Sequence, residues 1–223
     1  MSVRDATRFA RAAAGTVVAC ALALATVAGA DVTYSGRAYG ARVVLVNPQP
    51  NVLVFSDTGA LPPSGGSLSA TLLSILLGNT LSSHTITAST SGTGGVATSS
   101  AHQEMAVAFS GQPAQITADV VEAHSQATCS GVQGSSVVTH LTFGGNAVTV
   151  TGQPNQTVTI ANVATLVINE QIVAPAARDI TVNALHLYLG TGEEVILSSA
   201  HSDVACPTPA RDMTWGRIKT VYR

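Results

Sequence analysis

The chain has 223 residues, of which 46% are hydrophobic, 10% are charged and 4% are aromatic. This composition is too apolar for a disordered chain, and its charges are too few for a coiled coil. Ten Lys or Arg residues against 12 Asp or Glu residues exclude a strongly basic nucleic-acid-binding protein.

The first 30 residues have the layout of a secretory signal peptide. Arg4, Arg8 and Arg11 precede an uncharged apolar run, and Ala28-Gly29-Ala30 follows that run as a small-residue cleavage site. The run is short for a membrane span. We therefore expect cleavage after Ala30, export of the mature chain, and no membrane span within it.

Cys20 offers a weaker alternative, a lipoprotein signal. The preceding Val17-Val18-Ala19 lacks the usual Leu, and the apolar run continues past the cysteine. Signal-peptide cleavage would remove Cys20 together with three arginines and one aspartate. The mature chain would then be mildly acidic and would have no electrostatic attraction to phosphates or anionic lipids.

Two cysteines, Cys129 and Cys206, remain in the mature chain. Two cysteines in an exported protein suggest one disulfide, and two free buried thiols are the alternative. The bridge would close a loop of roughly 78 residues, which the chain-entropy model equates with roughly 4.5 kcal/mol of stability.

The rest of the chain has the pattern of β-strands separated by turns. Residues 31–46 are β-prone, residues 57–67 have loop composition, and later segments alternate with period two, which is typical of half-buried strands. A glycine-rich turn is expected at residues 91–95, within a loop across residues 91–100, and hairpins are expected at Gly144-Gly145-Asn146 and Gly190-Thr191-Gly192. The side chains expected to share one face are Met105, Val107 and Phe109 in one strand, and Val137, Thr139, Leu141 and Phe143 in another.

Residues 68–77 are the one helical candidate. Leu68, Leu72, Leu73 and Leu76 have the spacing of one helix face, although a buried strand is nearly as compatible with so short a run. We therefore expect a single all-β domain at residues 31–207, an antiparallel β-sandwich of jelly-roll-like or Greek-key type with at most this one short helix. Residues 208–223 are expected to form a polar C-terminal tail.

Two segments repeat the form A-H-S-x-x-x-C. One runs from Ala123 to Cys129 and the other from Ala200 to Cys206, and each follows an apolar β-prone run. The cysteines occupy equivalent places at the ends of the two segments. This equivalence favours the Cys129–Cys206 disulfide, although seven residues are too few to demonstrate a duplication.

Five stretches between residues 34 and 207 carry a resemblance to a known family. They are Ser35–Gly40, Asp57-Thr58-Gly59 with Leu61-Pro62, Ile116–Val121 running to Cys129, Gly152–Val158 with Ile168–Gln171, and Ile180–His186 leading to Cys206. In their order and spacing the chain resembles the choice-of-anchor P family of bacterial surface domains. The resemblance implies an exported, largely β domain of uncharacterised biochemical role. Members of the family carry differing C-terminal anchors, and no recognisable anchor follows Cys206, so we expect free secretion or association with the cell surface.

No catalytic motif is present. The chain lacks a G-x-S-x-G elbow, an H-E-x-x-H zinc motif, a calcium loop and a phosphate-binding glycine loop. The paired carboxylates Glu193 and Glu194 are adjacent, so they would point to opposite faces of a strand and are expected in a solvated turn. We expect no catalytic residue, no cofactor and no metal ligand.

The histidines leave one alternative open. His124 and His201 occupy equivalent places in the repeat and could share a metal ion if their strands were neighbours, with Glu122 or Asp203 as a third ligand. The competing interpretation is that both histidines face water, because period two places them opposite the residues aligned with the cysteines.

The sequence thus favours a secreted or cell-envelope β domain of structural or adhesive type without catalytic activity. Its ligand would be a protein or a glycan, its loops 57–67 and 91–100 would contact that ligand, and nucleic acid is not expected as a partner. One alternative is a self-assembling fibre subunit that donates its N-terminal strand, residues 31–46, to another copy. A metal-dependent enzyme that uses the histidines is a weaker alternative.

Overall fold

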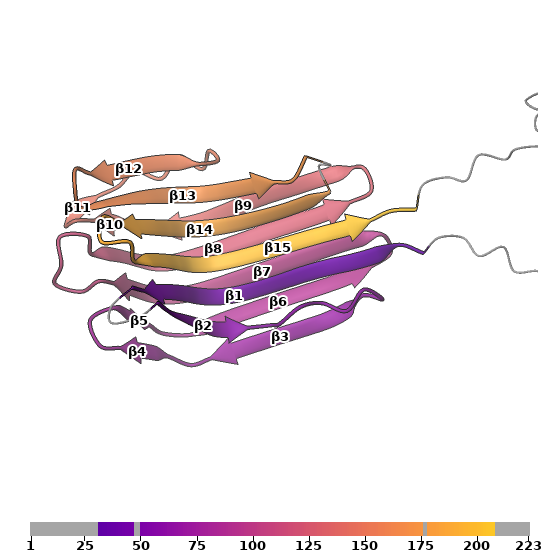
Figure 1. Ribbon diagram of the computed structural model, residues 1–223, viewed down its shortest axis with the longest axis horizontal. Helices are drawn as coiled ribbons and strands as arrows, with labels where there is room; N and C mark the ends of the chain where they lie inside the picture. The colour runs from indigo at the N-terminus through magenta and orange to yellow at the C-terminus, as the bar shows by residue number, and fades with distance from the viewer. Residues whose placement is uncertain (1–30, 47–49, 176–177, 208–223) are drawn as a thin grey trace, which may run out of the picture.

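The computed structural model describes residues 31–46, 50–175 and 178–207 as two antiparallel sheets packed face to face (Figure 1). The expected signal peptide, residues 1–30, and the C-terminal tail, residues 208–223, lie outside these ranges. The prediction of an all-β antiparallel sandwich is confirmed. Within the described ranges there is no helix that is long and apolar enough to cross a membrane.

The first sheet, sheet A, has six strands in the order β12-β13-β14-β15-β1-β2. Their bounds are Gln156–Ile160 (β12), Ala164–Val173 (β13), Asp179–Leu189 (β14), Glu194–Ala205 (β15), Thr33–Leu45 (β1) and Asn51–Asp57 (β2). The first strand of the domain therefore lies inside sheet A, paired on one side with β15 and on the other with β2.

The second sheet, sheet B, is centred on β7 and β8. Its long strands are Gly66–Leu72 (β3), Ile86–Thr93 (β6), Val96–Ala108 (β7), Ile116–Thr128 (β8) and Gly131–Thr139 (β9), which pair in the order β3-β6-β7-β8-β9. Its short strands are Ile75–Leu77 (β4), Leu81–Ser83 (β5), Thr142–Phe143 (β10) and Asn146–Ala147 (β11).

Most neighbouring strands are also neighbours in sequence. Strands β6 to β9 and β12 to β15 form meanders, and the chain changes sheet between β2 and β3 and again between β11 and β12. The strand order, which the sequence leaves open between jelly-roll-like and Greek-key arrangements, is thus built from meanders. Because Thr33 pairs with Ala205, β1 begins and β15 ends at the same end of the sandwich.

The helical alternative for residues 68–77 is wrong, because these residues contribute to the strands β3 and β4. The run is not buried either: Leu73 and Leu76 are each 82% exposed, and Ile75 is the large side chain that enters the core. Ten residues bury too little surface to hold a helix on this edge, whereas β3 gains backbone hydrogen bonds to β6 along its whole length.

The turns were predicted well, including the glycine-rich turn at residues 91–95, but the extent of one loop was not. Hairpins form at Gly144-Gly145 and around Gly190-Thr191-Gly192, as expected. Residues 91–100 are not a loop, because β6 and β7 continue through them and are joined by Gly94-Gly95 alone. Both glycines have positive φ, 58° and 78°, which suits a two-residue hairpin turn.

The interior has an apolar region and a region of small side chains. Fully buried Leu and Ile side chains fill the apolar region, among them Leu81, Ile86, Ile116, Leu166, Leu185 and Leu197. Where β1 and β15 face β6, β7 and β8, the buried positions are small. We call this the small-residue zone, and it comprises Gly36, Ala38, Thr90, Ser99, Ala101, Ser125 and Ser202.

Hydrogen bonds join the two sheets across the small-residue zone. The Ser99 hydroxyl donates to the backbone carbonyl oxygen of His201 at 2.6 Å, and the hydroxyls of Ser125 and Ser202 are 2.8 Å apart. A side chain can reach a carbonyl group of the facing sheet only where the sheets approach closely. A Cβ atom at Gly36 would collide with the Thr90 hydroxyl, so the absence of a side chain there permits the approach.

One residue in each of five strands of sheet A leaves the regular alternation at the same level, which we call the kink line. Gly40, Ala184 and Asn169 have no partner in the strand register, and neither do Ser56 and Ser198. Three of the five have positive φ, namely Ser56, Asn169 and Ser198. The register is the same on both sides of the line, so these residues lie opposite one another, and each strand shifts its alternation of side chains by one position there.

The kink line also provides contacts to sheet B. The Ser198 hydroxyl donates to the carbonyl oxygen of Val121 at 2.8 Å, and Gln103, which is fully buried, donates to the carbonyl oxygen of Gly40 at 3.2 Å. Polar side chains inside the sandwich are therefore held by backbone carbonyl groups of the facing sheet.

Sheet B has interruptions of its own, and they overturn two predicted faces. Met105 has a φ of 50° and is 52% exposed, whereas Phe109 is buried, so Met105, Val107 and Phe109 do not share a face. His140, with a φ of 50°, likewise separates exposed Val137 from buried Leu141. A period-two pattern in the sequence does not reveal where the alternation of side chains shifts by one position, because the same period resumes after the shift.

The Cys129–Cys206 disulfide is present, with 5.7 Å between the two Cα atoms. Cys129 lies in the turn between β8 and β9, and Cys206 directly follows β15. The bridge therefore ties a turn of sheet B to the end of a central strand of sheet A.

Adding one methyl group at Gly40 should destabilise the protein. The Cβ of Gly40→Ala would collide with Cγ2 of Ile86, and overpacking of this kind costs about 1–3 kcal/mol. Urea unfolding should show the loss, and Ile86→Ala should cost less in the Gly40→Ala background than alone, because the two side chains compete for one space. Additive effects would contradict the close packing.

Removing the disulfide should lower the free energy of unfolding by up to roughly 4.5 kcal/mol, the chain-entropy value for a loop of this length. The Cys129→Ser, Cys206→Ser double variant and the reduced wild type should unfold at the same urea concentration, below that of the oxidised wild type. Equal midpoints for oxidised and reduced protein would show that the bridge does not stabilise the fold.

Candidate binding groove and an opposing polar cluster

The outer face of sheet B carries a groove of about 480 Å³ lined by hydroxyl and amide side chains. Strands β3, β6, β7, β8 and β9 build it, and the strand register aligns its side chains in two rows across the sheet. The first row is Ser89, Ser100, His124 and Ser135 in the lining, continued in register by Ser69 of β3 beside it. The second row is Ser67, Ser91, Thr98, Gln126 and Gln133.

The alternation of each strand creates these rows. On β6, Ser89 and Ser91 face the groove while Thr90 points inward, and on β7 Thr98 and Ser100 flank the inward-facing Ser99. The turns set the register: two residues join β6 to β7, and two residues that include Cys129 join β8 to β9. A shift of one residue would point every groove side chain into the core.

Hydrogen bonds order the hydroxyl groups within the groove. The hydroxyls of Ser89 and Ser100 are 2.9 Å apart, and those of Ser91 and Thr98 are 2.8 Å apart. The lining contains no Lys, Arg, Asp or Glu, and its single titratable side chain is His124. The groove therefore offers many hydroxyl and amide hydrogen-bond donors and acceptors without a Lys, Arg, Asp or Glu among them.

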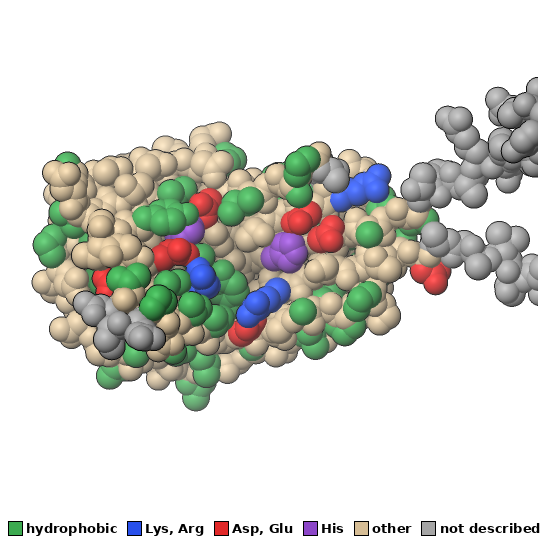
Figure 2. All heavy atoms as spheres, in the orientation of Figure 1, with side chains coloured by type: hydrophobic (Ala, Val, Ile, Leu, Met, Phe, Trp, Pro, Cys, Tyr) green, Lys and Arg blue, Asp and Glu red, His purple; other side chains and the backbone are tan. Residues whose placement is uncertain are grey.

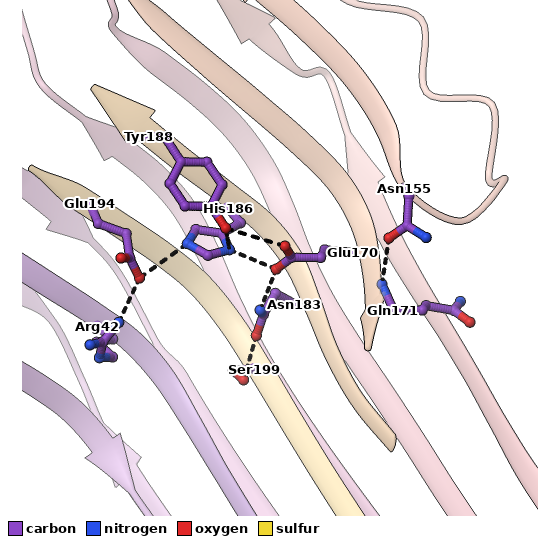
Figure 3. A network of polar contacts seen from close by, with 9 residues as sticks. All are labelled: Arg42, Asn155, Glu170, Gln171, Asn183, His186, Tyr188, Glu194 and Ser199. Atoms are coloured by element: carbon purple, nitrogen blue, oxygen red, sulfur yellow. Dashed lines mark hydrogen bonds and ion pairs between the residues drawn. The ribbon is translucent and has the colours of Figure 1, made fainter. Parts of the chain in front are cut away.

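Sheet A presents a different surface, with charged side chains gathered near its middle (Figure 2). A connected polar cluster joins four of its strands (Figure 3). The cluster comprises Glu170 on β13, Asn183, His186 and Tyr188 on β14, Glu194 and Ser199 on β15, and Arg42 on β1. At its centre, one oxygen of Glu170 lies 2.6 Å from His186 Nδ1 and accepts a hydrogen bond of 2.6 Å from Asn183.

The kink line makes this cluster possible. Asn183 and His186 are three residues apart and would point to opposite faces of a regular strand. The alternation of β14 shifts by one position at Ala184, between them. Both side chains therefore reach the outer face, where both contact Glu170.

His186 lies between two carboxylates. Its Nδ1 contacts Glu170, and its Nε2 is 3.1 Å from a Glu194 oxygen, although the angle does not make this second contact a hydrogen bond. The same Glu194 oxygen pairs with Arg42 at 2.6 Å.

The surroundings shift the pKa of two members of the cluster. Burial acts to raise the pKa of Glu170, but hydrogen bonds from His186 and Asn183 outweigh burial and lower it. For Tyr188, burial and then the nearby Glu170 carboxylate raise the pKa to about 12. Both shifts favour a Glu170 that is ionised and a Tyr188 that is neutral at neutral pH.

The cluster has little capacity to bind a ligand. The side chains of His186 and Glu170 are only 8% and 14% exposed, and Glu170 is already bonded to three neighbours. Ser199, the hydroxyl at its edge, donates to Asn183 at 2.7 Å. Except for His186 Nε2, the buried polar atoms of the cluster are bonded within it, so the cluster joins strands and leaves the groove as the candidate binding site.

The two histidines of the repeat do not come together. Strands β8 and β15 belong to different sheets, so His124 faces outward from sheet B and His201 faces outward from sheet A. His124 lies 2.9 Å from Glu122, and His201 lies 3.1 Å from Thr181 and 3.4 Å from Asp179. The assumption of neighbouring strands is therefore wrong. No group of three or more His, Cys, Asp or Glu residues among those described could hold a metal ion.

One further expectation needs correction: Glu194 is not in a solvated turn, because it begins β15 and pairs with Arg42. The loop expected at residues 57–67 is present, since residues 58–65 join β2 to β3 without a strand. The Thr58 and Leu61 amides of this loop donate to backbone carbonyls of β1, and Leu61 is buried. The groove was missed by sequence reasoning, although Ser-x-Ser pairs at Ser67 and Ser89 were a visible signal.

Fold and geometry together define a β-sandwich with a neutral polar groove on one sheet. Comparisons with protein-family models, with curated proteins and with solved structures gave no match. The resemblance to choice-of-anchor P domains accordingly stays a prediction.

Replacing Glu170 by Gln should destabilise the protein at neutral pH by about 1–3 kcal/mol, because hydrogen bonds to a charged group are lost. The folded-state pKa of Glu170 is below its unfolded value of about 4.3, so the carboxylate stabilises the fold above that pH. This stabilisation is lost as the pH falls through the folded-state pKa.

The wild type and Glu170→Gln should therefore differ in urea midpoint at pH 7 and converge at pH 3. Glu104→Gln is the matched control, since the Glu104 side chain is 52% exposed. If the urea midpoints of Glu170→Gln and Glu104→Gln depended on pH in the same way, the cluster would not stabilise the fold through Glu170.

Proposed function

We propose that the chain is an exported, non-enzymatic β-sandwich of structural or adhesive type, secreted or held at the cell envelope, which binds a polar ligand in the groove of sheet B. The observation that carries this proposal is the groove itself: two rows of hydroxyl and amide side chains across five strands, without a charged residue in the lining.

The rigidity of the groove supports a binding role. Its polar side chains stand on paired strands, and their own hydrogen bonds already restrict them. Side chains held in this way lose little conformational entropy when a ligand binds. The Cys129–Cys206 bridge is consistent with an oxidising compartment outside the cell.

The enzyme alternative has less support. It requires His124 and His201 to share a site, and the sandwich separates them. The most perturbed titratable groups, those around Glu170, form an internally bonded cluster that is largely covered. The lining of the groove, in turn, holds no pair of carboxylates.

The fibre alternative would require β1 to leave an interior position. Strand β1 is paired with β15 from Thr33 to Val44 and with β2 from Tyr39 to Leu45. Donation of β1 to another copy would break both ladders and open the core at Ala41 and Val43, which are fully buried. Binding through the groove needs no such rearrangement.

A groove-filling substitution tests the proposal. Ser100 lies in the middle of the first row, so the indole of Ser100→Trp should occupy the groove. We expect the full chain to cosediment with envelope material of the producing cell, and Ser100→Trp to reduce the bound fraction at least tenfold. Thr157→Trp, on the exposed edge strand β12, places the same side chain far from the groove and should bind like wild type.

Folding is checked by the urea midpoint of each variant, which should stay close to that of wild type. The proposal fails if wild type does not bind envelope material, or if the two tryptophan variants bind equally well.

A further inference from the structure

We infer that the groove takes a neutral carbohydrate chain and that this chain lies across the strands of sheet B. This inference rests on the proposed function and names the class of ligand and its direction.

The chemistry of the lining matches that of a sugar. Ser and Thr hydroxyls and Gln amides each donate and accept hydrogen bonds. A carbohydrate presents neutral hydroxyl groups with the same dual capacity at nearly every position. The pairs Ser89–Ser100 and Ser91–Thr98 use one contact of each hydroxyl and leave acceptor positions free.

Charge argues against an anionic polymer. Residues 31–207 contain three arginines, no lysine and ten Asp or Glu residues. One of these carboxylates, that of Glu122, lies beside the groove and contacts His124. Phosphate, sulfate or uronate groups would therefore meet repulsion and no cationic partner in the lining.

Shape and composition argue against a protein ligand. The centres of protein interfaces depend on large apolar or aromatic anchors that fill pockets. The groove lining contains neither aromatic nor large aliphatic side chains. A chain of hydroxylated rings needs no such anchors, because it gains hydrogen bonds along its length.

The register argues for the direction of the chain. Each row places one polar side chain on each of five strands, about 4.8 Å apart, so a row extends over about 19 Å. Along a strand, the two rows are separated by only about 7 Å. A ligand that crosses the strands therefore meets a hydroxyl, imidazole or amide at every step, whereas a ligand parallel to them meets two.

The two ends of the groove differ in the length of their side chains. Short Ser side chains line it on β3 and β6, whereas Gln126, Gln133 and His124 project from β8 and β9. The longer amides reach further over the groove, and we assign to them the discrimination between sugars.

The test uses neutral linear oligosaccharides as probes, namely cellohexaose, maltohexaose and mannohexaose, with polygalacturonate and dextran sulfate as anionic counterparts. Binding is followed by amide chemical shifts of the isotope-labelled full chain. We expect at least one neutral probe to bind and to shift amides on all five strands from β3 to β9. The anionic polymers should leave these amides unchanged.

Gln126→Leu should weaken binding of that probe at least fivefold, because the amide is replaced by an apolar group of similar size. Gln153→Leu, in the exposed segment before β12, is the matched control and should bind like wild type. Shifts confined to two neighbouring strands would overturn the direction, and preferential binding of the anionic polymers would overturn the ligand class.

Treatment of envelope material separates this inference from the proposed function. Periodate oxidation should abolish binding that is sensitive to Ser100→Trp, and protease treatment should leave it intact. Binding that survives periodate but is lost after protease treatment, together with no amide shift by any neutral probe, would contradict the carbohydrate inference. Groove-mediated binding would then still stand. Loss of all binding to untreated material would remove both.

Discussion

The close approach of the two sheets in the small-residue zone is the constraint on which the rest of the structure depends. Gly36 leaves room for the Thr90 hydroxyl, and Ser99 reaches the backbone of His201 in the facing sheet. Such contacts are directional, unlike the packing of Leu and Ile in the apolar region. They fix the position of one sheet relative to the other and the distance between the sheets. Apolar packing alone would define both less sharply.

The kink line separates the apolar region of the interior from the small-residue zone. Each of the five strands that cross the line shifts its inward side chains by one position there. Large residues thereby face inward on one side of the line, and Ala38 and Ser202 face inward on the other. The same shift brings Asn183 and His186 to one outer face, where Glu170 joins them. One backbone feature thus sets both the core and the polar cluster.

The sequence was sufficient for the class of fold, for two hairpins and for the disulfide, because alternation, turn residues and the paired cysteines are local signals. It was insufficient for the partition of strands between sheets, and this is why a site shared by His124 and His201 stayed open as an alternative. Nor did it reveal the shifts of alternation at Met105 or Asn169, since the period of two is intact on both sides of each residue. The groove depends on register across five strands, and the alternation within a strand does not specify register.

The disulfide holds the turn between two of the strands that build the groove. Cys129 lies in the turn that joins β8 to β9, the two strands that carry Gln126 and Gln133. Its bond to Cys206 holds that turn against the end of β15, whose Ser202 already bonds to Ser125 of β8. A two-residue turn with a fixed position cannot change the β8–β9 register, and a change of register would invert every groove side chain on β9. The bridge therefore stabilises the arrangement of donors and acceptors as well as the fold, and this preorganisation favours a ligand that depends on many weak hydrogen bonds.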